Sequence, residues 1–207
     1  MIIVPADKQS IHQATDILRA GGLIAYPTET YYGLGVDPYN HQALQRLFTI
    51  KQRASHLPIL VLVENIQQAK TLAVLPLPHS FTRLAEHFWP GPLTLVCSAR
   101  PELENELTGG TATIGMRQSS NHVAQQLVQA FGRPITATSA NLSGCMPASS
   151  AAQVAAFFAD NIDIIIDGGE TLGTKGSTLV KCEHGSIECI RQGMIDFQAI
   201  KQKNLTL

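Results

Sequence analysis

The chain has 207 residues, of which 44% are hydrophobic and 15% are charged, so it is long and apolar enough to bury a core of its own. Its 15 basic and 16 acidic side chains give a formal net charge of −1. This balance argues against a protein held to nucleic acid mainly by a broad basic surface, although it is compatible with a local basic cleft.

The first half of the chain alternates helical and strand-like patterns. Apolar residues at helical spacing end at Gly21-Gly22, and the apolar run that follows stops at Pro27. A nearly continuous apolar run is typical of a strand buried on both faces. The expected elements are, in order, a helix over residues 11–18, a strand over 23–26, a helix over 41–53, a strand over 58–63, helices over 66–72 and 79–88, a rigid turn over 89–92, and a strand over 93–98.

The second half continues the alternation and finishes with two strand-like runs in succession. The expected elements are a strand over 112–117, a helix over 121–131, a strand over 134–138, a helix over 151–159, a strand over 162–167, a hairpin of strands over 177–181 and 186–191, and a short helix over 195–202. Helices alternating with strands, followed by a hairpin, predict an α/β fold whose single sheet mixes parallel and antiparallel strands. With neither a linker nor a repeat in the sequence, we expect one domain over residues 1–207.

Targeting and metal-binding signals are absent from the sequence. The apolar runs fall far short of the ~20 residues that cross a bilayer, and the first residues lack the pattern of a signal peptide. The cysteines, which are Cys97, Cys145, Cys182 and Cys189, have no C-x-x-C spacing, and the histidines have no H-x-x-x-H spacing. We therefore expect a cytoplasmic protein with no disulfide framework, no protein-held metal and no membrane contact.

Polar segments that follow apolar strands are the candidates for a ligand site. Residues 26–35 (YPTETYYGLG) and residues 136–144 (TATSANLSG) each follow such a strand, and open α/β sheets bind ligands beyond strand ends. A tight turn explains the first segment equally well, and a helix cap followed by a turn explains the second.

A pair of cations lies at the end of the helix expected over residues 41–53. Lys51 and Arg53 could straddle an anionic ligand, with Arg53 offering a planar fork and Lys51 a point charge. Cations at this end of a helix also interact favourably with the helix dipole, and for an isolated pair that structural explanation is the stronger one.

Taken together, these segments resemble one known family. The ordered strings YPTETYYGLG, KQR, WPGPLT, IGMR, SANLSG, DGG, GSTLV and IRQG match the YrdC/YciO family over nearly the whole chain. The resemblance implies an open, strongly twisted mixed sheet flanked by helices around a large concave cleft. It also implies the activity of the short, single-domain threonylcarbamoyl-AMP synthases, in which L-threonine, bicarbonate and ATP give L-threonylcarbamoyladenylate and pyrophosphate.

The resemblance assigns site residues position by position. It implies catalytic roles for Lys51, Arg53, Ser139 and Asn141. ATP would contact these four residues together with Thr113 and Arg191. L-Threonine would be held by Thr28, Arg117, Ser177 and the backbone at Ala137. Mg²⁺ is expected to arrive on the phosphates, with no protein ligand for a metal.

The family pattern also leaves alternatives open. The product is expected to pass to proteins that complete a threonylcarbamoyladenosine modification of tRNA, with at most weak tRNA binding by this chain. The alternatives are a YciO-like paralogue, an RNA-binding module without synthase activity, and a related carbamoyl-adenylate transfer. The chain departs from the pattern at Ala54, Leu57-Pro58 and Leu62, and it has Pro147 where many members have serine.

Overall fold

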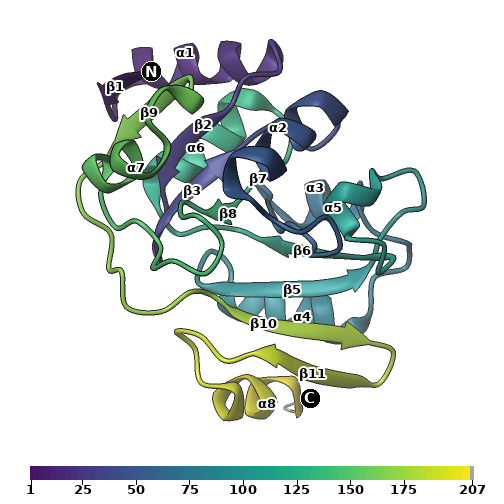
Figure 1. The fold of residues 1–207 in the computed structure, drawn as a ribbon. Coiled ribbons are helices and arrows are strands. Elements are labelled where there is room, and N and C mark those ends of the chain that lie inside the picture. Colours follow the sequence, from purple (N-terminus) through teal and green to yellow (C-terminus); the bar gives the residue numbers. More distant parts are fainter. Residues whose placement is uncertain (206–207) are drawn as a thin grey trace.

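Two mixed sheets form the framework of the chain (Figure 1). The structure, a computed structural model, describes residues 1–205, so Thr206 and Leu207 of the expected domain lie outside the described residues. One sheet has the order β1 (Ile2–Pro5), β9 (Ile164–Asp167), β2 (Ile24–Pro27), β3 (Tyr32–Gly35) and β8 (Thr138–Ser139). The other has the order β11 (Ser186–Arg191), β10 (Thr178–Glu183), β5 (Leu93–Ser98), β6 (Thr113–Arg117), β4 (Val61–Leu62) and β7 (Ile135–Thr136). Both sheets combine parallel and antiparallel pairs, as expected for the mixed α/β class.

Helices cover both faces of the five-stranded sheet and one face of the six-stranded sheet. The helices are α1 (Lys8–Arg19), α2 (His41–Lys51), α3 (Ile66–Lys70), α4 (His79–Phe88), α5 (Asn105–Thr108), α6 (His122–Phe131), α7 (Ala151–Phe158) and α8 (Phe197–Leu205), with a 3₁₀ turn at Ala159–Asn161. α1 and α6 pack together on one side of β2 and β9, and α7 packs on these strands with α2 in the same apolar cluster. α4 packs against β5, β10 and α8. None of the helices within residues 1–205 is both long and apolar enough to cross a membrane.

The alternation of side chains along each strand explains the layers. In β2, Ile24 and Tyr26 belong to the apolar cluster with α1 and α6, whereas Ala25 belongs to the cluster with α2 and α7. Successive side chains of a strand point to opposite faces, so a strand with apolar residues at every position is buried on both faces.

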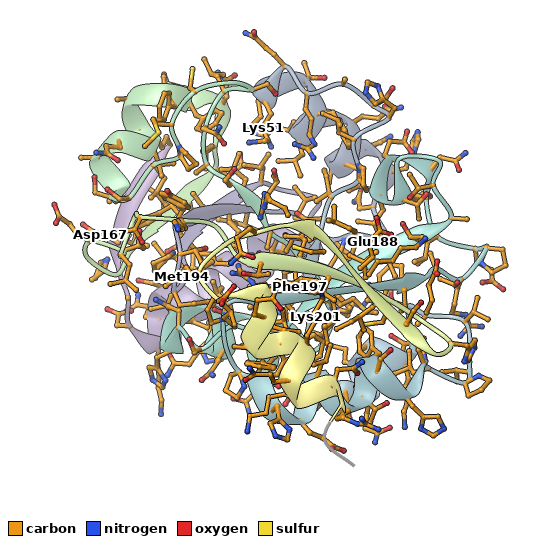
Figure 2. All side chains as sticks on the ribbon, turned by 90° about the horizontal axis from the view of Figure 1, so that it is seen from below. Lys51, Asp167, Glu188, Met194, Phe197 and Lys201 are labelled. Atoms are coloured by element: carbon orange, nitrogen blue, oxygen red, sulfur yellow. The ribbon has the colours of Figure 1, made fainter. Side chains whose placement is uncertain are left out.

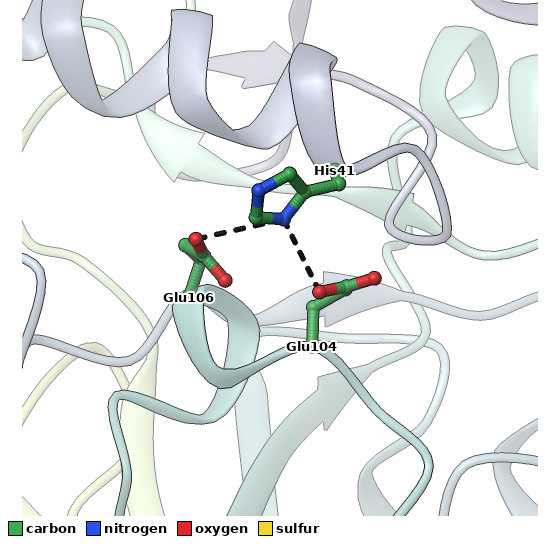
Figure 3. A group of neighbouring side chains, drawn as sticks. All are labelled: His41, Glu104 and Glu106. Atoms are coloured by element: carbon green, nitrogen blue, oxygen red, sulfur yellow. Dashed lines mark hydrogen bonds and ion pairs between the residues drawn. The ribbon is translucent and has the colours of Figure 1, made fainter.

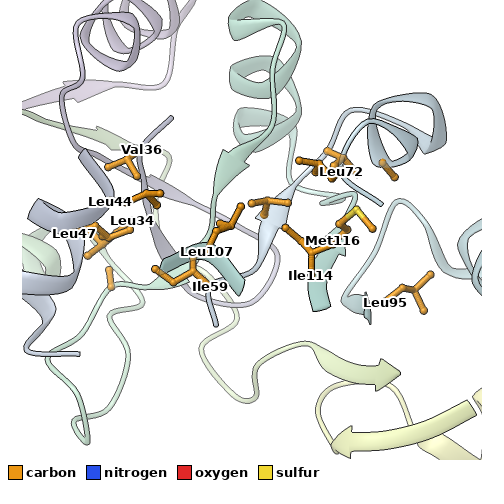
Figure 4. Packing of buried hydrophobic residues seen from close by; sticks show 14 of the residues in the cluster. Leu34, Val36, Leu44, Leu47, Ile59, Leu72, Leu95, Leu107, Ile114 and Met116 are labelled. Carbon is orange, nitrogen blue, oxygen red and sulfur yellow. The ribbon is translucent and has the colours of Figure 1, made fainter. Parts of the chain in front are cut away.

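The six-stranded sheet is different because only one of its faces is apolar throughout. Leu95 of β5 and Met116 of β6 are opposite each other and fully buried in the core, where Figure 4 shows them near Leu72 and Ile114. The intervening positions carry small or polar residues, such as Thr94 and Gly115, and these point to the other face. That face carries the site described below.

β1 and α5 were not expected from the sequence, and the helices expected over 41–53 and 66–72 end earlier, at Lys51 and Lys70. Three further differences between the expected and observed elements concern the surroundings of the site. β3 lies inside the segment expected as a ligand loop, because Tyr32–Gly35 pairs antiparallel with β2 and is buried along its whole length. The strand expected over 58–63 shortens to β4, since the Ile59 N–H donates to the Leu107 carbonyl outside the sheet. The expected strand over 134–138 divides into β7 and β8, which join different sheets and so connect the two.

Candidate functional site

A cleft of about 700 Å³ lies over the uncovered face of the six-stranded sheet. Its floor consists of alternate residues of β5, β6 and β10, which are Thr94, Val96, Thr113, Gly115, Arg117 and Leu179. The β2–β3 turn, β8 and the segment 175–177 add residues from elsewhere in the fold. In Figure 1 the segment after β9 runs along one side of the molecule from the five-stranded sheet to β10. The cleft therefore collects residues from both sheets, as is common for ligand sites of this size.

Eight of the ten site residues expected from the sequence line this cleft. They are Thr28, Arg53, Thr113, Arg117, Ala137, Ser139, Ser177 and Arg191. Lys51 and Asn141 are not among the lining residues and lie behind the wall that carries Ser139. The ten residues are thus neighbours, but they divide into a group that faces the cleft and a pair that supports its wall.

Arg117 is held in the cleft by a buried ion pair. Its Nη1 lies 2.8 Å from the Glu29 Oε1, and the two side chains are 4% and 10% exposed. Ser119 Oγ donates to the other carboxylate oxygen of Glu29, and Arg117 Nη1 also lies 3.4 Å from the Thr30 Oγ1. Within residues 1–205, the buried Nε of Arg117 has no hydrogen-bond partner. Glu29 therefore fixes the Arg117 guanidinium through Nη1, while the Nε–H donor of the guanidinium remains unpaired among the described residues.

The β2–β3 turn, which carries Thr28, is closed by its own hydrogen bonds. The Thr28 N–H donates to the Tyr31 carbonyl at 3.2 Å, and Thr28 Oγ1 donates to the same carbonyl at 2.6 Å. The N–H of Thr30 donates to Thr28 Oγ1 at 3.2 Å. Below the turn, the buried Tyr26 hydroxyl donates to the Thr136 carbonyl at 2.8 Å, and burial raises the pKa of this phenol. The turn is a rigid wall of the cleft.

Ser177 and Arg191 also line the cleft. The hydroxyls of Ser177 and Thr94 are 2.8 Å apart, and Arg191 Nη2 donates to the Ser177 carbonyl at 3.0 Å. A Cβ at Gly193 would lie 2.3 Å from the Gly176 carbonyl oxygen, so only glycine permits this approach of the β11 end to the 176–177 backbone. Burial lowers the pKa of Arg191, with a smaller effect from the nearby Arg117.

The lining of the cleft is cationic. It includes Arg53, Arg117, Lys175 and Arg191, and among residues 1–205 no carboxylate belongs to the lining. Arg53 donates to the carbonyls of Leu57 and Pro58, at 3.3 Å from Nε and 2.9 Å from Nη2, which keeps its charge uncompensated. Such a cleft attracts anionic ligands strongly, because low-dielectric walls focus the field of like charges.

Lys51 is almost fully buried behind β8, with 1% of its surface exposed. Its Nζ donates to the Ser139 carbonyl, to the Asn141 carbonyl at 2.8 Å and to the Asn141 Oδ1 at 3.2 Å. Burial, with a smaller effect from Arg53, lowers the pKa of Lys51 to about 7. The separation of Lys51 from Arg53 arises at Gln52, whose φ of 51° is left-handed and ends α2 between them.

Sequence reasoning missed three residues of the site. Glu29 stands inside the polar segment after β2, but nothing in the sequence pairs it with Arg117 across 88 positions. Thr94 occupies an alternate position of a predicted strand, so the period-2 pattern could have indicated that it faces away from the core. Lys175 lies in the glycine-rich stretch after β9, and no motif distinguishes it from a surface lysine.

A second cluster of potential ligands lies away from the cleft. Figure 3 shows His41 at the start of α2 facing Glu104 and Glu106, with its Nδ1 at 3.2 Å and 3.6 Å from their carboxylates. The three side chains could each offer one ligand atom to a metal, yet His41 is exposed, Glu104 and Glu106 are partly exposed, and none lines the cleft. Their geometry is that of a surface ion-pair cluster.

The positions that depart from the family pattern also have defined places. Leu62 is fully buried in β4 among residues of the α1–α6 cluster, so it does not line the cleft. Leu57 is 40% exposed next to the Arg53 hydrogen bonds, whereas Pro147 lines the cleft.

A family model described as "Telomere recombination", the Sua5/YciO/YrdC model, matches residues 16–193. The chain belongs to the Sua5/YciO/YrdC family. The prediction made from the ordered motifs is thereby confirmed.

Relatives in this family are named for one activity. The chain is 35% identical over 196 residues to a threonylcarbamoyl-AMP synthase of Pyrococcus abyssi, which covers 95% of this chain and 57% of that protein. It is 39% identical over 159 residues to a threonylcarbamoyl-AMP synthase of Halorhodospira halophila, covering 76% of this chain and 82% of that protein. The chain thus spans little more than half of the archaeal Sua5/YciO/YrdC relative.

Solved structures of the family confirm the predicted fold. The crystal structure of P. abyssi Sua5 complexed with L-threonine matches with a TM-score of 0.94 at 34% identity, covering 98% of this chain and 61% of that one. The crystal structure of E. coli YciO matches with a TM-score of 0.84 at 28% identity, covering 94% of each chain. The expected sheet framework is present, built as two linked sheets.

Proposed function

We propose that the chain is a threonylcarbamoyl-AMP synthase, a nucleotidyltransferase that joins L-threonine, bicarbonate and ATP and releases pyrophosphate. The observation that carries the proposal is the cleft itself, in which uncompensated cations lie beside the buried Arg117–Glu29 pair with no carboxylate in the described lining. A relative of this family is known as a complex with L-threonine, and several relatives carry the name of this activity.

The amino acid would be bound at the Arg117 end of the cleft. Its carboxylate would bind the Arg117 guanidinium, whose Nε has no partner within residues 1–205, since arginine binds carboxylates through two parallel hydrogen bonds. Thr28, Ser177 and the backbone at Ala137 line the same cleft and would orient the rest of the substrate. The threonine amine then adds to bicarbonate with loss of water, which gives a carbamate.

The nucleotide would be bound where the remaining cations gather. A carbamate oxygen attacks the α-phosphorus of ATP, the bond to the β,γ-phosphates breaks, and pyrophosphate leaves with the bonding electrons. Negative charge builds on the phosphoryl oxygens and on the leaving group, so fixed cations that meet this charge lower the barrier. Arg53, Lys175 and Arg191 would supply them, and the Thr113 and Ser139 side chains lie in the same lining.

A divalent ion fits this site only as part of the nucleotide. No carboxylate belongs to the described lining, and Glu29 is already occupied by Arg117 and Ser119. Mg²⁺ commonly keeps several waters and relies on substrate phosphates, so the chain would not need to provide a ligand for it. The ion would neutralise charge on the phosphates, while the protein orients the nucleotide through the cations named above.

The role in the cell follows from this chemistry. An acyl-adenylate such as threonylcarbamoyl-AMP is a reactive donor, so partner proteins would transfer its threonylcarbamoyl group to tRNA in the cytoplasm. Direct tRNA binding by this chain would be weak, because 15 basic against 16 acidic side chains leave no broad basic surface to contact many phosphates.

The test is pyrophosphate release from ATP and bicarbonate with L-threonine, and with L-serine as the control amino acid. Release that depends on threonine and bicarbonate is the expected result, and Arg117→Ala should raise the threonine concentration needed for it. A folded protein that releases no pyrophosphate with threonine and Mg²⁺ present would reject the synthase and favour a binding role of the YciO type.

A further inference from the structure

Lys51 has no free donor with which to bind a substrate. An ammonium group has three N–H donors, and the Lys51 Nζ has three oxygen acceptors, which are the carbonyls of Ser139 and Asn141 and the Asn141 Oδ1. The side chain is buried and is not part of the cleft lining. Figure 2 marks Lys51 at the end of α2, well apart from α8 with its Phe197 and Lys201.

The backbone of Lys51 binds the same segment as its side chain. The Lys51 carbonyl accepts hydrogen bonds from the Ser143 N–H and from the Ser143 Oγ, both at 3.1 Å. Both the side chain and the backbone carbonyl of Lys51 therefore attach residues 139–143 to the end of α2. The start of the segment is also fixed from elsewhere, because β8 pairs with β3 at Thr138 and Ser139, and Ala140 donates to the Tyr32 carbonyl at 2.8 Å and accepts from the Ala148 N–H at 2.9 Å. The contacts of Lys51 extend this attachment to residues 141 and 143.

Asn141 extends this arrangement to the cleft. Its Oδ1 accepts from Lys51 Nζ and from Ser139 Oγ, the latter at 2.7 Å, and its Nδ2 donates to the Cys145 carbonyl at 2.7 Å. Both polar ends of Asn141 are thus occupied within the protein. Ser139 does line the cleft, and its hydroxyl proton is already directed towards Asn141, so this hydroxyl presents acceptor lone pairs.

We propose that Lys51 is a positioning residue: from behind the cleft wall it holds Asn141 and the 139–143 backbone, which set the direction of the Ser139 hydroxyl, and it does not itself bind phosphate. The four motif residues then divide into two pairs, with Arg53 and Ser139 facing the substrates and Lys51 and Asn141 supporting them. This inference rests on the proposed function for its catalytic consequence, while the attachment of the segment can be measured without any turnover.

Hydrogen exchange tests the attachment directly. In Lys51→Met, which keeps most of the length of the side chain and removes its donors, amides of residues 141–146 should exchange about tenfold faster or more, the effect expected when several hydrogen bonds are lost together. Lys70→Met is the matched control, because Lys70 also lies in the last turn of a helix and touches nothing in this segment. Unchanged exchange in Lys51→Met overturns the proposal.

Kinetics test the consequence for the reaction. Lys51→Met should lower kcat by about 10² while the KM for ATP changes less than threefold, whereas Arg53→Met should raise the KM for ATP. Lys51→Arg keeps the charge and should still fail, because a planar guanidinium cannot meet the same three acceptors. The double variant Lys51→Met with Ser139→Ala should lose little more than either single variant.

The outcomes separate this inference from the proposed function. Full rescue by Lys51→Arg, or a rise in the KM for ATP in Lys51→Met that matches Arg53→Met, would make Lys51 a direct source of charge and overturn the positioning role. If the wild-type protein releases no pyrophosphate, the proposed function fails, and the exchange measurement alone then decides whether Lys51 holds the segment.

Discussion

Replacing Glu29 by alanine would leave the Arg117 guanidinium buried without its countercharge. The two side chains are 10% and 4% exposed, so solvent cannot replace the lost carboxylate. Removing one partner of a buried ion pair costs about 3–5 kcal/mol, and a further loss comes from the Ser119 hydroxyl, which donates to the same carboxylate. For a chain of this length each kcal/mol shifts the melting temperature by about 2–4 °C, so Glu29→Ala should melt about 6–20 °C below the wild type.

Denaturant unfolding of the wild type and three variants distinguishes the free-energy cost of the unpaired Arg117 charge from a simple loss of contacts. The set comprises the wild type, Glu29→Ala, Arg117→Ala and the double variant. Because the double variant contains no unpaired charge, it should be more stable than the sum of the single changes predicts, with a coupling of about 1 kcal/mol or more. Additive changes, or a loss below about 1 kcal/mol in Glu29→Ala, would mean that the pair is solvated and would refute the reasoning.

Calorimetry with L-threonine connects this stability to binding. Glu29→Gln keeps the shape of the side chain but removes its charge, so Arg117 loses the partner that orients it. We expect threonine affinity to fall about tenfold or more, the loss typical of a hydrogen bond to a charged group. Unchanged threonine affinity in this variant would mean that Arg117 does not bind the carboxylate of threonine.

Two further predictions concern the fold around the site. Gly35→Ala should cost about 1–3 kcal/mol in urea unfolding, because its Cβ would lie 2.8 Å from core side chains, whereas Gly33→Ala in the same strand should be nearly neutral, with contacts of 3.5 Å or more. Burial lowers the pKa of Lys51 from 10.5 to about 7 in the folded protein. Between pH 7 and 10.5 the unfolded chain therefore binds a proton that the folded chain does not. The contribution of Lys51 to the free energy of unfolding rises over this range. Lys51→Met should flatten this rise, and parallel pH profiles of wild type and variant would contradict it.

Much of the fold could be predicted because local patterns and tertiary packing agree. The helix over 79–88 and the strand over 93–98 have the predicted ends in α4 and β5, where the turn between them and the apolar periodicity agree. β3 was missed because Tyr32–Gly35 contains two glycines, which weaken a strand pattern. Its stability comes from pairing with β2 and from burial, which a local pattern does not contain.

The sequence predicted which residues lie near one another, and it did not predict which of them face the cleft. The motifs lie at strand ends and turns that the fold brings together, so eight of the ten residues face one cleft. Lys51 and Arg53, however, are two positions apart at a helix end, and residues at this spacing lie on different sides of a helix. The left-handed Gln52 completes their separation. The conformation of one residue thus decides which cation faces the cleft.

The cations of the cleft are of two kinds, one neutralised by a carboxylate and the others uncompensated. At one end, Arg117 is neutralised by Glu29, so what it offers a ligand is direction rather than net charge. Towards the rest of the cleft, Arg53 bonds only to carbonyls, and Lys175 forms no hydrogen bond or ion pair with any residue in 1–205, which keeps both charges uncompensated. The amino acid of the proposed reaction would fit the first environment, and its polyphosphate would fit the second. The overall charge of −1 conceals this division, because a binding site is governed by the charges that face it and not by their sum over the chain.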